Sequence, residues 1–380
     1  MRVFIFTIFA AFFAGVGAAE ADYKSEYKEY MAAYSAGDIE GALAHGEKAW
    51  RAAEEEIGAT ATTAILAYNF GRLAAATTPS TAEEAFERAL EITNSGEGSL
   101  LIPDLELRIA TMRNKIKPTN ETRKTLAEKV AAQKAADPAA TDATVAALSD
   151  LASYAASRGP EAGTNDADAY LNEAERLEPR ANNILANALT LAGAVRIAGR
   201  RRTATDIAEA VVLLDRAIAL FPPQKDIEHF DPGLASALVW RSTLDVVIES
   251  FLGKPVFKLG SRIAASEDLR AAYERAQESY SPPDSVWDSF RPESCENLEW
   301  AERKPPTYPK DAIHKGAIGA AIVGYDVDDT HIVRAVPLGE IYNSGFAAAA
   351  VKSMSSWKLK TPPPPECRKN ALTFFNFIMR

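Results

Sequence analysis

AAIVGYDV at residues 320–327, DDT at 328–330 and HIVRAV at 331–336 decide how the last part of this chain folds. Both apolar runs are rich in β-branched residues and are typical of strands. The residues between them, two aspartates and a threonine, are turn formers. The sequence therefore predicts a β-hairpin here.

The flanks of this hairpin complete a small α+β unit. The segment PPTYP at 305–309 holds the chain extended, so no helix is expected before Lys310. Ser344 is predicted to cap a short alanine-rich helix through Ala350, which a run of prolines brings to an end. A last strand is predicted over 372–379.

The order of these elements resembles the C-terminal domain of the TonB family. The residues that carry the resemblance, called the motif residues below, are Tyr308, Pro309, Gly319, Asp328, Ser344, Gly345, Ala350, Trp357 and Leu359. The resemblance covers residues 305–380. Two positions depart from it: His331 stands where the family usually has glycine, and Pro337 removes a backbone donor from the second strand. The alternative is a small α+β module of unrelated origin.

This resemblance implies protein binding. Members of the family typically pair the exposed edge of the small sheet with an extended segment of an outer-membrane receptor. The last strand is then the candidate edge, and its apolar residues are the candidate partner-binding residues: Leu372, Phe374, Phe375, Phe377, Ile378 and Met379. They fall on both faces of the strand, with Asn376 as the exception. Such a strand fits a helix on one face and a partner on the other, but equally burial within its own domain or a homodimer.

The chain has two cysteines, Cys295 and Cys367, on either side of the predicted domain. We expect them to form a disulfide, because the N terminus indicates export to a compartment where disulfides persist. Closing such a loop stabilises a fold by about 4–5 kcal/mol in the chain-entropy model. Two free thiols are the alternative. A catalytic or metal-binding role is less expected, because there is no Cys-x-x-Cys motif.

The N terminus has the features of a signal peptide. Arg2 is followed by an uncharged apolar run over 3–19 and by Ala19-Glu20-Ala21, which fits cleavage between Ala21 and Asp22. Residues 1–21 are therefore predicted to direct export, and the resemblance to the TonB family implies the periplasm of a Gram-negative bacterium as the destination. A retained inner-membrane anchor is the alternative, although a helix of this length reaches only about 25 Å of the roughly 30 Å hydrocarbon core.

Residues 22–280 are alanine-rich with helical spacing, and they repeat. A small residue, a larger one four positions later and alanine at the seventh recur as Ala82/Phe86/Ala89, Ala167/Leu171/Ala174, Ala210/Leu214/Ala217 and Ala265/Leu269/Ala272. This register resembles the tetratricopeptide repeat and predicts an all-α solenoid of helix pairs. A proline-containing linker over 281–304 is predicted to join it to the α+β domain at 305–380.

Composition and motifs argue against several classes of function. The net charge is −10, so nucleic acid is not an expected partner. The chain contains no zinc-protease motif, nucleophile elbow, phosphate loop or dinucleotide fingerprint. We predict no catalytic residues, no metal site and no cofactor, and hence no enzyme.

Two functions are consistent with these features. The first is a TonB-like protein that links envelope partners, either outer-membrane receptor segments or inner-membrane motor proteins, in receptor-dependent transport. The second is a periplasmic tetratricopeptide scaffold without an energy-transducing role, because helical repeats stand where the family usually has a long proline-rich spacer. Membrane contact is expected only if the N-terminal segment is retained.

Overall fold

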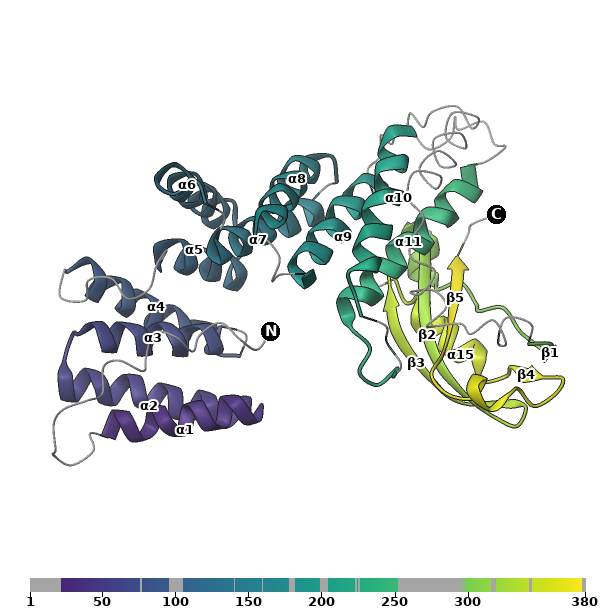
Figure 1. Cartoon of the computed structure of the whole chain (residues 1–380), viewed down its shortest axis with the longest axis horizontal. Helices are drawn as coiled ribbons and strands as arrows, with labels where there is room; N and C mark the ends of the chain where they lie inside the picture. Colours follow the sequence, from purple (N-terminus) through teal and green to yellow (C-terminus); the bar gives the residue numbers. More distant parts are fainter. Residues whose placement is uncertain are drawn as a thin grey trace. The chain divides into compact units, whose positions relative to one another are not determined.

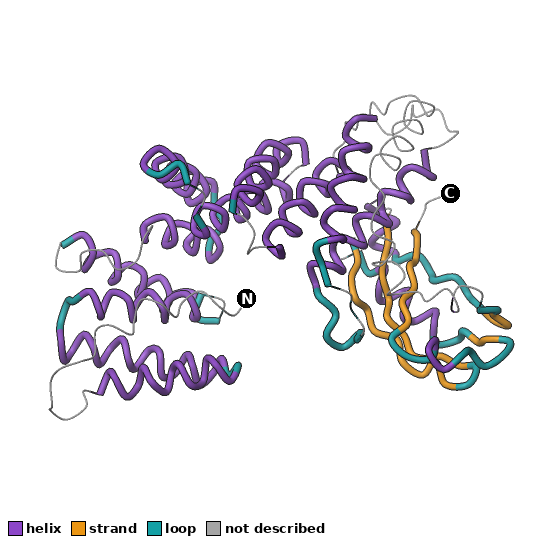
Figure 2. The backbone as a smooth tube through the Cα atoms, viewed as in Figure 1, coloured by secondary structure: helices purple, strands orange, loops and turns teal. Residues whose placement is uncertain are grey.

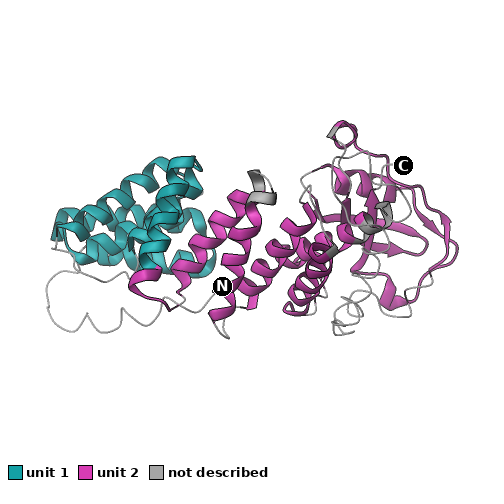
Figure 3. Cartoon of the chain, turned by 90° about the horizontal axis from the view of Figure 1, so that it is seen from above, with its two compact units in different colours: residues 1–133 teal, residues 134–380 magenta. Residues whose placement is uncertain are grey.

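The computed structural model is a long series of α-helices followed by a five-stranded antiparallel sheet (Figures 1 and 2). It describes residues 22–75, 77–95, 105–139, 141–158, 160–177, 182–198, 204–222, 224, 226–251, 295, 298–315, 319–341 and 344–377. The predicted fold class, a helical repeat-like region followed by a small α+β domain, is confirmed at this level. The chain divides into two compact units, Met1–Gln133 and Lys134–Arg380 (Figure 3).

The first unit is helical. Its elements are α1 (Asp22–Ala36), α2 (Ile39–Ile57), α3 (Ala61–Ala74), α4 (Pro79–Asn94), α5 (Leu105–Ile116) and most of α6 (Asn120–Ala136). Ala82, Phe86 and Ala89 of the predicted register are all fully buried. A Cβ atom on Gly71 of α3 would lie 2.7 Å from the Phe86 ring of α4. Small residues therefore let these two helices approach closely, as the register predicts.

The helices of the second unit continue the same kind of packing. They are α7 (Asp142–Arg158), α8 (Pro160–Arg176), α9 (Asn182–Ala198), α10 (Ala204–Ala219) and α11 (Pro232–Phe251). The repeat alanines and leucines in α8 and α10 are buried, whereas the fourth copy, Ala265/Leu269/Ala272, lies outside the described residues. A buried ion pair joins α11 to α10: Arg241 Nε donates to Asp215 Oδ1 at 2.8 Å.

The sheet has the strand order β1-β4-β3-β2-β5, and every neighbouring pair is antiparallel. The strands are β1 (Trp300–Glu302), β2 (Gly319–Asp328), β3 (His331–Glu340), β4 (Lys358–Leu359) and β5 (Ala371–Phe377). Short helices α14 (Lys310–Lys315), α15 (Phe346–Met354) and the 3₁₀ turn η2 (Pro365–Cys367) connect them. The predicted hairpin corresponds to β2 and β3. Of the predicted last strand, residues 372–377 lie in β5, while Ile378 and Met379 lie outside the described residues.

Helices pack against both faces of the sheet. Contacts join α15 to β2 and β3, and α11 to β2, β3 and β5. Two glycines allow α11 to come close: a Cβ on Gly339 would lie 3.1 Å from Val239 Cγ2, and one on Gly324 would lie 2.7 Å from Ile227 Cγ2, just before α11. The face of the sheet that packs against α11 is called the α11 face below, and the face that packs against α15 is called the α15 face. Because both faces are covered, β2 is buried along almost its whole length.

Helices α7–α11 and the sheet thus share one compact unit. The predicted domain limits at 22–280, 281–304 and 305–380 differ from the division between the two units. Most of the predicted linker lies outside the described residues. These limits therefore stay predictions.

Candidate functional site

β5 forms one end of the sheet and pairs only with β2 there. Seven consecutive residue pairs join the two strands, from Gly319↔Phe377 to Tyr325↔Ala371, without a register shift. No strand in the part of the chain that the structure describes pairs with the other side of β5. This side is the sheet edge that the family resemblance predicts for partner binding.

Two hydrogen bonds fix which β5 groups point outward. The carbonyl of Ala320 accepts from Ile341 N–H at 3.4 Å, on the β3 side, and Val327 N–H donates to the Arg368 carbonyl at 2.7 Å, next to the start of β5. Because the N–H and C=O of one residue point to the same side and alternate along a strand, the odd-numbered β2 residues face β5. Their partners in β5 are also odd-numbered. The N–H and C=O groups of Leu372, Phe374 and Asn376 therefore point away from β2, and we call them the outer edge.

The α15 face of β5 is covered by an aromatic cluster. The Phe377 ring stacks on Phe346 of α15 with centroids 4.1 Å apart, and Tyr308 meets both rings edge-on at 5.5–5.6 Å. Phe375 lies 5.3 Å from Trp357, whose indole N–H donates to the Lys304 carbonyl at 2.9 Å. Burial raises the pKa of the Tyr308 phenol. These contacts account for the apolar residues on this face without a partner.

The opposite face of β5 is part of the α11 face of the sheet. Leu372 pairs with Gly324 and Phe374 pairs with Ile322, and paired residues of an antiparallel ladder share a face. Leu372 is buried and Phe374 is half-buried, whereas Asn376 is exposed. Both faces are therefore largely covered from within the chain, and the outer edge is the part of β5 that remains for pairing.

The other edges of the sheet are less suitable for an added strand. β1 has three residues, a register irregularity and a charged end at Glu302. β3 pairs with β4 at His331 only, but it carries Pro337 and two register irregularities against β2. Short length, bulges, charges and proline are the features that block edge-to-edge pairing. β5 has neither a charged residue nor a proline over Ala371–Phe377.

The motif residues occupy structural positions around this site. Ala350, Trp357 and Leu359 are buried, Gly319 begins β2, and Asp328 ends it at an exposed turn. Gly345 has a left-handed backbone with φ of 79°, which favours glycine. Pro309 accepts the backbone hydrogen bond of Ile313, so the helix α14 begins where the prolines end.

The predicted helix cap at Ser344 is wrong. Its hydroxyl donates to the Ile341 carbonyl at 2.7 Å and does not cap the helix. The N-cap residue of α15 is Gly345, which has no side chain that could accept a hydrogen bond. The carboxylate of Glu340 accepts from the N–H groups of Gly345 and Ala347 at 3.2 and 2.8 Å. The Glu340 side chain at the end of β3 therefore accepts from two N–H groups at the start of α15. Local capping patterns do not reveal this residue, because it lies outside the positions that they include.

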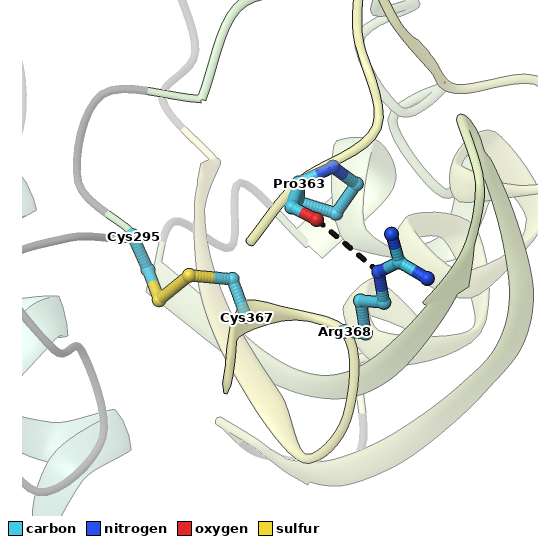
Figure 4. Close-up of a disulfide and its surroundings, with 4 residues drawn as sticks. All are labelled: Cys295, Pro363, Cys367 and Arg368. Carbon is cyan, nitrogen blue, oxygen red and sulfur yellow. Dashed lines mark hydrogen bonds between the residues drawn. A yellow bond between two sulfur atoms is a disulfide. The ribbon is translucent and has the colours of Figure 1, made fainter. Parts of the chain in front are cut away.

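The predicted disulfide is present, and the free-thiol alternative is wrong. Cys295 and Cys367 are joined with Cα atoms 5.6 Å apart, and Cys367 is buried (Figure 4). The bond precedes β5 by three residues and closes a loop with a sequence separation of 72. Arg368 next to it donates from Nε to the Pro363 carbonyl at 3.2 Å (Figure 4). The start of β5 is thus fixed in position relative to the segment before β1.

One group of side chains with metal-ligand chemistry was not predicted. Asp226, Glu228 and His229 lie on an exposed segment before α11, with one potential ligand atom of each within 4.8 Å of the others. His229 Nδ1 is 2.8 Å from Asp226 Oδ2, and this hydrogen bond raises the pKa of His229 and lowers that of Asp226. Glu228 pairs with Arg334 of β3 at 2.9 Å. Asp226 and His229 therefore pair with each other within the segment, and the Glu228–Arg334 pair links the segment to β3.

The described helices include none that is both long and apolar enough to cross a membrane. The predicted signal segment, including Ala21, lies outside the residues searched, and Asp22 is the first residue of α1. No protein-family model matches this chain. A comparison with curated proteins also finds no match.

Proposed function

We propose that this protein is an exported, TonB-like protein-binding protein that captures an extended segment of an envelope partner along the outer edge of β5. Its helical region belongs to the tetratricopeptide class and presents a second binding surface. Its partners are outer-membrane receptor segments or inner-membrane motor proteins, in receptor-dependent transport. The chain binds its partners and performs no catalysis.

The observation that carries this proposal is the contrast between the edges of the sheet. β5 offers seven regular residues without a charge or a proline, whereas β1 and β3 have the features that block pairing. A regular, uncharged apolar edge is an aggregation hazard unless something covers it. A binding partner that adds a strand removes this hazard and provides backbone hydrogen bonds at the same time.

The disulfide supports export. Disulfides persist in oxidising compartments such as the periplasm and are rare in the cytosol. The Cys295–Cys367 bond agrees with the signal segment predicted over residues 1–21. The disulfide and the predicted signal segment favour an exported location, which the family resemblance makes the periplasm of a Gram-negative bacterium, with cleavage after Ala21 and an inner-membrane anchor as the alternative.

A second function, a periplasmic scaffold without energy transduction, is favoured by the packing of α11 on the sheet. The Thr243 hydroxyl of α11 accepts from Ala320 N–H at 3.1 Å near the start of β2, and the Arg334–Glu228 ion pair joins β3 to the segment before α11. A sheet fixed to a helix in this way moves with it. A scaffold needs such a fixed geometry, whereas a transducer with a long spacer does not.

The test uses two substitutions at one exposed position. Asn376→Pro removes an outward N–H and leaves the β2 ladder intact, because Asn376 bonds away from β2. Asn376→Thr is the matched control, since it keeps the N–H group and suits a strand. In the full-length chain we expect a peptide selected from a displayed random library to bind the wild type and Asn376→Thr alike. Asn376→Pro should bind it about tenfold or more weakly, since one lost hydrogen bond and a steric clash act together.

The partner itself is identified in the cell envelope. A photo-crosslinking amino acid at position 376 should form adducts with an envelope protein, whereas the same group at the exposed position Val333 on β3 should not. Equal binding of the peptide by both Asn376 variants, or equal crosslinking from both positions, would show that the outer edge of β5 is not the binding site.

A further inference from the structure

One polar side chain interrupts the apolar surface of β5. Its sequence is ALTFFNF, in which Thr373 is buried and Asn376 is exposed. Asn376 pairs across the ladder with Ala320, which is fully buried and has only a methyl group to offer. The ladder with β2 therefore gives the Asn376 amide no hydrogen-bonding neighbour on its own face of the sheet.

The neighbours of Asn376 along the same face are apolar. Phe374 and Leu372 lie on the α11 face with Ile322 and Gly324, where the segment before α11 and the helix itself cover them. Packing by α11 explains the apolar side chains there. It does not explain an amide at the exposed end of the same row.

The geometry points to a role for Asn376 in partner choice: we propose that it is a specificity-determining residue that selects a hydrogen-bonding side chain at one position of the captured strand. This inference rests on the proposed function, because it concerns the same outer edge. The occupant is an extended protein segment that is uncharged along its length. It carries serine, threonine, asparagine or glutamine beside Asn376 and apolar residues at its remaining positions on the α11 face.

The physical reason is the cost of covering an amide. A strand paired with the outer edge places a side chain on the α11 face at about 4.5–5.5 Å from Asn376. An apolar side chain there removes water from the amide and returns no hydrogen bond, which is the expensive case. A polar uncharged side chain of similar size replaces the lost bonds. A charged one would lose its own hydration beside uncharged neighbours.

The expected preference is large enough to measure. Leaving a buried polar group unsatisfied reduces affinity by about tenfold or more relative to a matched polar partner. Since valine and threonine have nearly the same shape, exchanging one for the other in a bound peptide isolates the hydrogen bond from packing. Asn376→Val makes the complementary change in the protein and keeps the outward N–H.

The experiment compares displayed random peptide libraries selected on the full-length chain and on Asn376→Val. On the wild type, one position of the enriched peptides should favour serine, threonine, asparagine or glutamine, and on Asn376→Val that position should become apolar while the others stay unchanged. In single peptides, threonine-to-valine exchange there should weaken binding to the wild type about tenfold and leave binding to Asn376→Val unaffected.

The outcomes separate this inference from the proposed function. Peptides that lose affinity for Asn376→Pro but show the same residue preferences on the wild type and on Asn376→Val would overturn the role of Asn376 and leave strand capture intact. Peptides that bind all three proteins equally, or a library that yields no binder, would overturn both.

Discussion

A methyl group at Gly324 should loosen the packing of α11 on the sheet. A Cβ there would lie 2.7 Å from Cγ2 and 2.9 Å from Cβ of Ile227, well inside the usual carbon contact of about 3.5–4.0 Å. Ile227 is 3% exposed, and its N–H donates to Asn370 Oδ1 at 3.4 Å, so it has little freedom to withdraw. We therefore expect Gly324→Ala to require a local shift of about 1 Å at an interface close-packed like a protein core.

The net cost can be worked from two opposing effects. Overpacking a dense core costs about 1–3 kcal/mol. Alanine reduces the freedom of the unfolded chain and returns about 0.4–1 kcal/mol. Gly324→Ala should then destabilise the unit by about 1–2 kcal/mol. Gly339→Ala should cost less, because its Cβ would lie 3.1 Å from Val239 Cγ2 and needs a smaller adjustment.

Hydrogen exchange of the β2 amides as a function of urea is the appropriate assay, because a chain with two units need not unfold in one step. Ile227→Ala supplies the coupling test. Its own cost of about 2–5 kcal/mol should fall by roughly 1 kcal/mol in the presence of Gly324→Ala, since the new methyl group fills part of the cavity. A Gly324→Ala cost below about 0.5 kcal/mol, or strict additivity with Ile227→Ala, would refute the close contact between this segment and the sheet.

Other substitutions test the remaining parts of the structure. Cys295→Ser with Cys367→Ser should destabilise the sheet by up to about 4–5 kcal/mol, measured by urea unfolding of oxidised and mutant protein, and an unchanged midpoint would contradict a stabilising role. Asp215→Asn should cost about 3–5 kcal/mol because it removes the carboxylate charge that faces the buried Arg241 guanidinium, whereas Glu299→Gln at the exposed Lys360 pair should cost under about 1 kcal/mol. In a proton titration followed by NMR, the pKa of His229 should fall toward its ordinary value in Asp226→Asn. Because the folded pKa is raised, the His229 interaction should favour folding below the unfolded pKa and be lost as pH rises through the folded one.

Local patterns in the sequence predict the elements whose signals lie within a few residues. The hairpin of β2 and β3 follows from two β-branched runs around an Asp-Asp-Thr turn, and β5 follows from an apolar run after the proline segment. The disulfide follows from there being only two cysteines in a chain whose N-terminal sequence predicts export. For the hairpin and for β5, neighbouring residues carry the whole signal.

Elements that depend on distant contacts were not predicted. β1 and β4 have three and two residues, and Lys360 N–H bonds to the Glu299 carbonyl from far along the chain. The packing of α11 on the sheet depends on Gly324 meeting Ile227, which lie in different predicted domains. A glycine within a strand indicates a close approach of another element, but the sequence does not say which element approaches.

The same packing of α11 determines how a pulling force on the sheet would pass to the neighbouring helices. A strand captured at the outer edge of β5 pulls on a ladder of seven residue pairs to β2. β2 is in turn held to the α11 side through Gly324, through the Thr243–Ala320 bond and, by way of β3, through the Arg334–Glu228 pair. Load on the captured strand would therefore reach the helical region through packed side chains and not through an extended spacer. If the outer edge of β5 captures a strand as proposed, the second unit would hold that strand at a fixed separation from a partner of α7–α11. Linking two binding events in this way raises the effective concentration of the second partner without any further contact.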